Sequence, residues 1–408
     1  MQKGKILNDP IHGFISIKNP IDFEIIEHPY FQRLRRISQL GLTYLVYPGA
    51  HHTRFHHTLG AYHLIKKTIR HLREKGIEIS EAEENGASRA ILLHDIGHGP
   101  FSHALEHSIV PGISHEAISL KLMHFFNAKY PGEFDIAIQI FNKAYERPFL
   151  NELISSQLDV DRLDYLKRDS FYSGVSEGVI NSDRLISMLS VVNNELVVEQ
   201  KAIYSVEKFI LARRLMYWQV YLHKTVLSAE IILEKILKRA KFLVTQGQDL
   251  FATKHLKFFL SNDIELSHFD RGDIMKIFCS LDEYDIMSGI KEWMTHSDFI
   301  LSELCTRLIN RNLLKLKFDD AYRDNWSEYI EKKRIEVKKM YDLSDEEVEY
   351  FVFEGNITQS IYNPDKEVIR IYLKNGEIEP FGRTTKNINM GLLTGINSKK
   401  FICYPNSM

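Results

Sequence analysis

The sequence has few cysteines, no long apolar run and almost no net charge. Its three cysteines, Cys279, Cys305 and Cys403, form no CxxC pair, which argues against a disulfide framework and against a cysteine-based zinc site. No run of about 20 apolar residues suits a membrane span, and no signal-peptide core follows the first residues, so we expect a cytoplasmic protein without a membrane partner. With 52 basic and 54 acidic residues, the formal net charge is −2, and nucleic acid is not expected as the main partner.

The chain is long enough for one large domain or two ordinary ones. It has 408 residues, of which 44% are hydrophobic, and helical spacing of apolar residues dominates from about residue 20 to 185. Residues 204–245 contain neither glycine nor proline and predict one unusually long helix, which could be kinked. We predict a mainly α fold, with a helical core over residues 1–300 and a small α/β region over residues 301–408.

Short strands are expected at a few places. Two Asn residues at 193 and 194 predict a hairpin turn, and Asn375-Gly376 is the strongest short hairpin signal in the chain. An Asn-Asp-Pro turn precedes an alternating segment near the start. The predicted strand segments are 13–17, 191–198, 313–318, 349–353, 368–373 and the residues around 378.

Residues 90–103 carry the clearest chemical signal. The apolar helix pattern of Ala90 to Leu93 continues with His94 and Asp95, where another Leu or Ile would be expected. A buried carboxylate needs a cationic partner or a metal, and neutral histidine is the commonest metal ligand. Together with His98 and His103, these residues place four metal-competent or catalytic side chains within ten positions, which favours a functional site over a simple helix end.

Glycine and proline shape the segment between these residues. Gly97 and Gly99 are expected to end the first helix, and Pro100 is expected to begin the next one. His98 then lies on a tight turn at the mouth of the site. His103 lies on the following helix and faces back towards it.

Neighbouring helical segments offer further ligands. Upstream, either His56 or His57 could point inwards at the start of a helix, and downstream the run Asp159-Val160-Asp161 supplies carboxylates. A mixed nitrogen and oxygen ligand set suits Mn, Fe, Co, Ni or Mg better than a closed structural zinc site, and it leaves positions for water and phosphate. The residues therefore predict a divalent metal cofactor whose identity stays open, zinc included.

The order of these motifs resembles the HD-domain deoxynucleoside triphosphate triphosphohydrolases. The similarity runs from about residue 4 to 320, and it implies that His57, His94, Asp95 and Asp161 bind the metal. The His-Asp pair alone is a weak signal for this family, whereas the full series of matching segments in this order is specific to it. The matching segments are Asn8–Gly13, Phe31–Arg35, Gln39–Gly41, Tyr47–Ala50, Arg54-Phe55, His57, Leu59-Gly60, His94-Asp95, Gly97–His103, His115-Glu116, Asp159–Asp161 and Asp164-Tyr165.

The resemblance implies hydrolysis of a dNTP at the α-phosphorus, giving a deoxynucleoside and inorganic triphosphate. A divalent ion suits this chemistry because it activates water and polarises phosphate oxygens. His103 and Glu106 stand three residues apart on one expected helix, so the carboxylate can orient the imidazole as an acid–base pair. By resemblance His103 is the catalytic histidine, and His115 belongs to a His-Glu pair placed against the phosphates. A histidine that merely starts a helix is the plain alternative for His115.

Substrate residues follow from the same resemblance. Arg54 and His98 are expected on the α-phosphate, and Arg213 is expected near the outer phosphates. Arg162 stands where the vertebrate enzyme of this family has lysine. Leu40 and Tyr221 could exclude a 2′-hydroxyl by bulk. Tyr217 stands where the vertebrate enzyme has histidine near the base, so base preference does not carry over. The full expected set is Gln39, Leu40, Arg54, His98, Arg162, Tyr165, Asp169, Arg213 and Tyr221.

A second nucleotide site is also expected from the resemblance, as is a homo-dimer or homo-tetramer. The candidate activator residues are Lys5, Asn8, Glu27, Gln32, Arg35, Arg311 and Lys315; ordinary surface charge would explain any one of them. Two other functions stay open. One is an HD phosphohydrolase that acts on a nucleoside monophosphate, a cyclic nucleotide or an alarmone, although the arginines favour a polyphosphate. The other is a nucleic-acid-binding module with a vestigial HD site.

Overall fold

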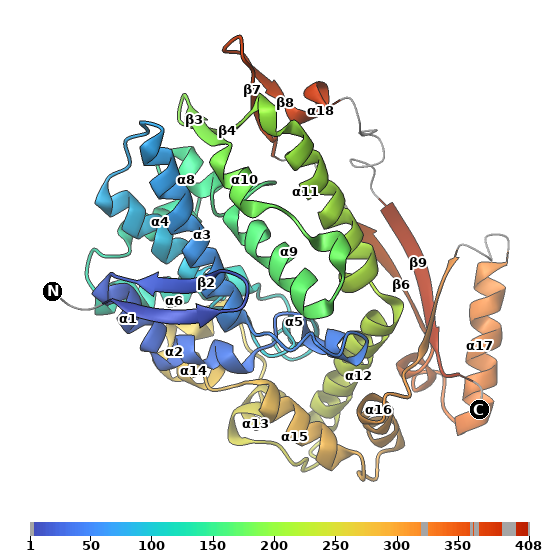
Figure 1. Ribbon diagram of the computed structural model, residues 1–408. Helices are drawn as coiled ribbons and strands as arrows, with labels where there is room; N and C mark the ends of the chain where they lie inside the picture. Colours follow the sequence, from blue (N-terminus) through green and yellow to red (C-terminus); the bar gives the residue numbers. More distant parts are fainter. Residues whose placement is uncertain (1–3, 320–324, 360–361, 363–366, 386–396, 407–408) are drawn as a thin grey trace.

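Figure 1 shows the computed structural model of the chain. It describes residues 4–319, 325–359, 362, 367–385 and 397–406. The α-helices are α1 Pro20–Glu27, α2 Pro29–Gln32, α3 Arg54–Glu74, α4 Glu81–Leu93, α5 Ser102–Ser108, α6 His115–Lys129, α7 Asp135–Phe141, α8 Pro148–Glu152, α9 Val160–Ser173, α10 Ser182–Ser187, α11 Ile203–Met216, α12 Lys224–Thr245, α13 Lys254–Ser261, α14 Gly272–Phe278, α15 Glu283–Trp293, α16 Phe299–Ile309, α17 Trp326–Tyr341 and α18 Phe381–Thr384. The strands are β1 Lys5–Asp9, β2 Gly13–Ile17, β3 Leu189–Val192, β4 Glu195–Glu199, β5 Lys315–Phe318, β6 Phe353–Gln359, β7 Arg370–Tyr372, β8 Ile378–Pro380 and β9 Asn397–Tyr404.

The mainly α fold with small sheets is confirmed. Helix α3 packs against both α4 and α9, and this group forms the centre of the helical body. The strands make three small sheets, ordered β1-β2, β3-β4-β7-β8 and β5-β9-β6. In Figure 1 the four-stranded sheet lies at the top, and the β6–β9 pair and α17 lie at the right. None of the described helices combines the length and the apolar character that a bilayer crossing requires.

The turn signals predict the hairpins correctly. Asn193 and Asn194 both have positive φ, 52° and 62°, as a two-residue hairpin turn with matching twist requires. β7 and β8 pair antiparallel across the Asn375-Gly376 turn. β4 also pairs in parallel with β7, so a strand from the middle of the chain joins one from its last part.

Two sequence-based expectations are wrong in detail. The long helix over 204–245 is interrupted, because α11 ends at Met216, a π-helical turn covers Tyr217–Tyr221 and α12 begins at Lys224. The expected strand at 349–353 is instead a 3₁₀ turn at Val348–Tyr350, and β6 begins only at Phe353. Phe351 and Val352 are both fully buried, so this segment lacks the alternation of a one-sided strand.

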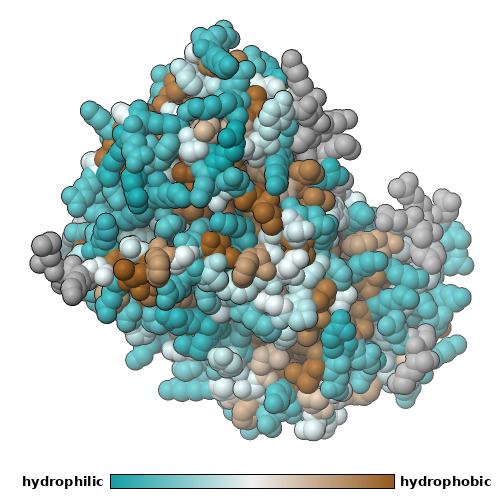
Figure 2. All heavy atoms as spheres, in the orientation of Figure 1, coloured by the Kyte–Doolittle hydropathy of each residue, from teal (hydrophilic) through white to brown (hydrophobic). Residues whose placement is uncertain are grey.

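The surface in Figure 2 is mostly hydrophilic on the face shown, with apolar side chains gathered over the β1–β2 hairpin at the left. Ile6 and Phe14 on this hairpin are 63% and 72% exposed. The three cysteines are free and buried.

Candidate metal centre and adjoining cavity

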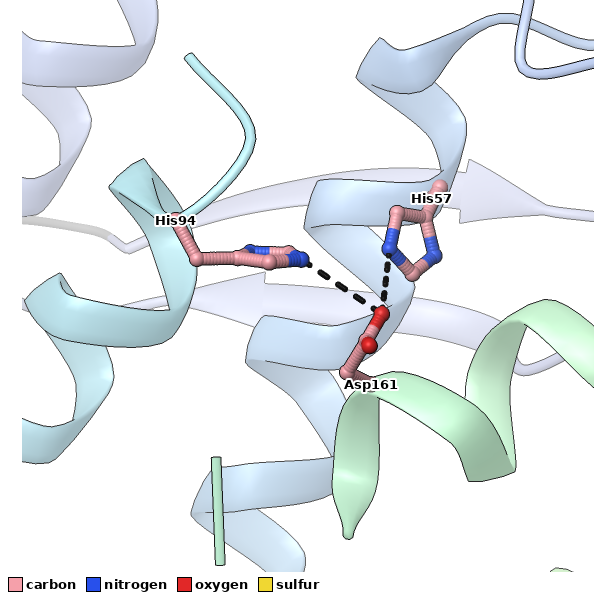
Figure 3. A group of neighbouring side chains, drawn as sticks. All are labelled: His57, His94 and Asp161. Carbon is pink, nitrogen blue, oxygen red and sulfur yellow. Dashed lines mark ion pairs between the residues drawn. The ribbon is translucent and has the colours of Figure 1, made fainter. Parts of the chain in front are cut away.

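The start of α3 decides which of its two adjacent histidines faces the site. Thr53 caps the helix, and the His56 Nδ1 atom accepts a hydrogen bond from the Thr53 backbone N–H at 3.2 Å. His56 is thereby held at the helix end. His57 points from α3 towards His94 and Asp161, as Figure 3 shows.

Three side chains from three helices converge in this cluster. The Asp161 Oδ1 atom, from the first turn of α9, lies 3.0 Å from His57 Nε2 and 3.4 Å from His94 Nε2, at the end of α4. Burial would raise the pKa of Asp161, but the adjacent His57 and His94 rings hold it below its usual value. The centre is therefore a carboxylate held between two imidazoles.

The donor set fits a divalent metal ion. His94 Nδ1 donates to the Ile91 carbonyl at 2.6 Å, and His57 Nδ1 donates to Asp164 Oδ2 at 2.8 Å, so both rings turn Nε2 towards Asp161. Both Nε2 atoms are buried and have no hydrogen-bond partner among the described residues. Ligand atoms that each lie about 2.1 Å from one ion are typically about 3 Å apart, which matches this spacing. His57, His94 and Asp161 could therefore hold a metal.

Asp95 joins this cluster to a second one. Its Oδ1 atom lies 3.3 Å from His94 Nε2 and 3.4 Å from His98 Nε2, and Arg54 Nη1 donates to Oδ2 at 2.6 Å. Burial would raise the pKa of Asp95, but the adjacent His94, His98 and Arg54 side chains hold it well below its usual range. Asp95, His98 and His115 form a second group of potential ligands.

A buried network that the sequence analysis gave no role supports His57 from behind. Asp164 accepts hydrogen bonds from His57, from His12 Nε2 at 2.7 Å and from Arg168 Nε at 2.9 Å, and Arg168 also reaches Asp9 at 2.8 Å. The i, i+4 spacing of Asp164 and Arg168 is the only local signal for it. Gly60 makes the network possible, because a Cβ there would lie 2.0 Å from Asp164 Oδ1.

We expect Asp164→Asn to destabilise the fold and weaken metal binding. The change removes a buried charge that balances Arg168, which costs about 3 kcal/mol of unfolding free energy, and it loosens the orientation of His57, which lowers metal affinity about 10- to 100-fold. Urea unfolding and metal titration measure the two effects. The control is Asp183→Asn, since Asp183 is exposed and pairs with Lys67 at the surface. Equal unfolding free energies for Asp164→Asn and the parent would contradict this role.

The segment between α4 and α5 differs from the expectation. Pro100 does not begin the next helix; α5 starts at Ser102, after Phe101 in the left-handed region with φ 47°. Gly97 allows α6 to approach this segment, because a Cβ there would lie 2.1 Å from the His115 carbonyl oxygen. The tight turn expected at His98 is thus packed against the start of α6.

The catalytic candidates lie on α5 and α6. His103 is the second residue of α5, and its side chain lies outside the described part of the structure. Glu106 Oε1 lies 3.1 Å from His115 Nδ1, and the His115 ring stacks on His98 with 3.7 Å between centroids. His115 does start α6, yet it also faces the site. Burial and the nearby Arg54 charge hold the pKa of His98 well below its usual value, so this ring is neutral.

A cavity of about 530 Å³ opens beside Asp95 and Asp161. A second cavity of about 480 Å³ shares Asp95, His115, Asp161 and Arg162 with it, so these residues lie where the two meet. Eight of the nine expected substrate residues line the first cavity: Gln39, Leu40, Arg54, His98, Arg162, Tyr165, Asp169 and Tyr221. The ninth, Arg213, lies outside that lining and donates to Gln157 Oε1 at 3.0 Å.

His52, which no sequence motif singled out, supports this cavity. His52 Nε2 donates to Asp169 Oδ1 at 2.7 Å, and the Tyr221 hydroxyl donates to Asp169 Oδ2 at 2.7 Å. His52 is buried and stacks on Tyr172. Asp169 therefore fixes Tyr221 of the π-helical turn in the cavity wall.

The expected activator residues lie on the surface in two places. Lys5, Asn8, Glu27, Gln32 and Arg35 belong to the first 36 residues, where Arg35 Nε donates to Gln32 Oε1 at 2.8 Å. Arg311 and Lys315 precede or begin β5, and Arg311 Nε donates to the Leu45 carbonyl at 2.7 Å. Among the described residues, no hydrogen bond or ion pair joins these two places, so a nucleotide site here stays a prediction.

Comparison with known proteins identifies the family. Residues 54–169 match the family model described as "HD domain", and residues 180–271 match "HD associated region". The uncharacterized protein YwfO of Bacillus subtilis (strain 168) is 32% identical over 397 residues, which cover 94% of this chain and 88% of that protein. The crystal structure of a phosphohydrolase from Bacteroides thetaiotaomicron VPI-5482 matches with a TM-score of 0.94 and 45% identity, covering 99% of this chain and 100% of the other. The chain belongs to the HD-domain phosphohydrolase family.

One further relative of this HD-domain protein carries a more specific name. The deoxynucleoside triphosphate triphosphohydrolase SAMHD1 homolog of Dictyostelium discoideum is 33% identical over 267 residues, which cover 60% of this chain. The match spans about half of that relative, 52% of its length. The histidines and aspartates of the cluster all lie within the HD-domain match.

Proposed function

We propose that the protein hydrolyses deoxynucleoside triphosphates to a deoxynucleoside and inorganic triphosphate. The observation that carries this proposal is a single cavity lined by the Asp95 and Asp161 carboxylates, by two arginines, and by aromatic and apolar side chains. The named SAMHD1 relative supports the substrate class. A divalent ion held by His57, His94, Asp95 and Asp161 would polarise the α-phosphate and activate water.

The chain's own residues bind and orient the phosphates in this proposal. Arg54 is held by Asp95 beside the cluster, and Arg162 pairs with the buried Asp159, so both cations are in fixed positions before substrate arrives. His98 is neutral and contacts a phosphate oxygen without adding charge. His103 donates a proton to the 5′ oxygen of the leaving deoxynucleoside, and Glu106 holds His115, which lines the cavity.

Ribonucleotides are expected to be poor substrates. Leu40 offers no hydrogen-bond partner to a 2′-hydroxyl, and Tyr221 is fixed by Asp169, so the wall excludes that group by contact. Leu40→Ala combined with Tyr221→Phe should narrow the dNTP to rNTP ratio of kcat/KM, chiefly by improving the rNTP. A matched dNTP and rNTP pair measures this ratio, with Tm as the control for stability. Equal kcat/KM values of the parent protein for the dNTP and the rNTP would contradict the exclusion of the 2′-hydroxyl by Leu40 and Tyr221.

A substrate survey tests the proposal against its rival. Metal-loaded protein is incubated separately with each dNTP, each rNTP, nucleoside monophosphates and cyclic nucleotides, and the nucleoside and nucleotide products are identified by chromatography. We expect deoxynucleoside from dNTPs alone. Turnover confined to monophosphates or cyclic nucleotides would favour another HD phosphohydrolase activity. A nucleotide activator and a homo-dimer or homo-tetramer stay predictions of the family resemblance.

A further inference from the structure

Glu230 lines the first cavity, of about 530 Å³, and is its one acidic residue without a role in the proposed hydrolysis. The other carboxylates that line this cavity, Asp95, Asp161 and Asp169, each lie within 3.0 Å of an arginine or histidine nitrogen. Glu230, on α12, makes no hydrogen bond or ion pair with the described residues. Burial raises the pKa of Glu230 to about 7. Glu230 is half-buried and lines the cavity, so its unpartnered carboxyl is available to a ligand there.

Glu230 lies next to the segment that follows Leu40, one of the expected sugar residues. Helix α12 packs against α5 and against the 3₁₀ turn Gly41–Leu45, which directly follows Leu40. A Cβ at Gly41 would lie 3.5 Å from Glu230 Oε1 and 4.0 Å from the Phe101 ring. The wall of the same cavity includes the apolar side chains of Leu42, Phe101, Ala104 and Leu233, and Phe101 approaches Gly41 as Glu230 does.

This wall has the chemistry that a nucleobase requires. Apolar and aromatic side chains accept the flat faces of a base, while a carboxylate accepts hydrogen bonds at its edge and donates none. Guanine presents two adjacent donors, N1–H and the 2-amino group, which match the two oxygens of one carboxylate. Adenine and cytosine present a ring acceptor beside their amino group, and thymine presents carbonyl oxygens on both sides of N3–H. An ionised carboxylate therefore suits guanine best.

We propose that Glu230 is a specificity-determining residue that binds the N1–H and 2-amino group of guanine, so that dGTP is the preferred substrate. This inference rests on the proposed function, because it assumes that the phosphates lie at the metal end of the same cavity.

Competition among substrates tests the assignment. An equimolar mixture of dGTP, dATP, dCTP, dTTP and dITP is given to metal-loaded protein at pH 8.5, where Glu230 is ionised, and initial rates of consumption give ratios of kcat/KM. Because all five substrates are present in one mixture, any nucleotide that activates the protein affects their rates alike and leaves the ratios unchanged. We expect dGTP to be consumed faster than dITP, which lacks the 2-amino group. Glu230→Gln should lower the dGTP to dITP and dGTP to dATP ratios about 10- to 100-fold, as the loss of a charged hydrogen bond predicts.

The matched control is Glu234→Gln, one turn further along α12, where Glu234 pairs with Lys238 and does not line the cavity. It should leave all ratios at the parent values. Equal consumption of dGTP and dITP by the parent, or unchanged ratios in Glu230→Gln at an unchanged Tm, would overturn the assignment.

A mixture in which no dNTP is consumed would instead contradict the proposed function. In that case, calorimetric binding of deoxyguanosine and deoxyadenosine to the parent and to Glu230→Gln decides the base assignment. Tighter binding of deoxyguanosine that is lost in the variant supports it, and equal binding of the two nucleosides overturns it.

Discussion

His94→Ala and Asp161→Ala are each expected to leave the purified protein without bound divalent metal and without measurable turnover. The two residues come from different helices and meet at 3.4 Å, so either change removes one of four proposed ligands from a site that also needs open positions. A site of this kind loses affinity sharply when one ligand goes. Elemental analysis of the variants and a turnover assay with added metal measure both effects.

His56→Ala is the matched control for this experiment. His56 neighbours a proposed ligand on α3 but caps the helix with Thr53, so its removal should cost some stability and leave the metal content at the parent value. Undiminished metal in His94→Ala or Asp161→Ala would contradict the ligand assignment.

His103→Ala should lower kcat by about two to four orders of magnitude, the range usual for a general acid or base, and keep both metal and substrate binding. This separation follows because the proposed metal ligands lie on α3, directly after α4 and on α9, whereas His103 lies on α5. Turnover with saturating substrate, substrate affinity and metal content are measured on one preparation.

The control for this variant is His124→Ala, an exposed histidine of α6 outside the cavity, which should behave as the parent. If His103→Ala turns over at the parent rate, the general acid lies elsewhere. His115 would then be the better candidate, because it contacts Glu106 and stacks on the neutral His98.

Local chemistry explains which parts of the fold could be predicted from sequence. The Asn193-Asn194 and Asn375-Gly376 hairpins follow from backbone conformations that few residues adopt, so two residues suffice to indicate them. The helical body follows from apolar spacing. The grouping of His57, His94 and Asp161 was expected from the resemblance, and the structure brings the three together.

Other features depend on contacts between distant residues, which local patterns do not reveal. The π-helical turn at Tyr217–Tyr221 contains no proline or glycine, so nothing in the sequence marks the end of α11. The Asp164 network joins residues up to 159 positions apart. The isolation of Glu230 is a property of what surrounds it and could not be inferred from a single Glu on a helix.

The most direct test of the central claim is to follow a single dNTP turnover in ¹⁸O-labelled water with metal-loaded protein and to identify both products by mass spectrometry. Attack of water on the α-phosphorus predicts inorganic triphosphate that carries one ¹⁸O atom, together with an unlabelled deoxynucleoside in equal amount, and no reaction once the metal has been removed. Label in the deoxynucleoside, or release of pyrophosphate or phosphate in place of triphosphate, would contradict the account.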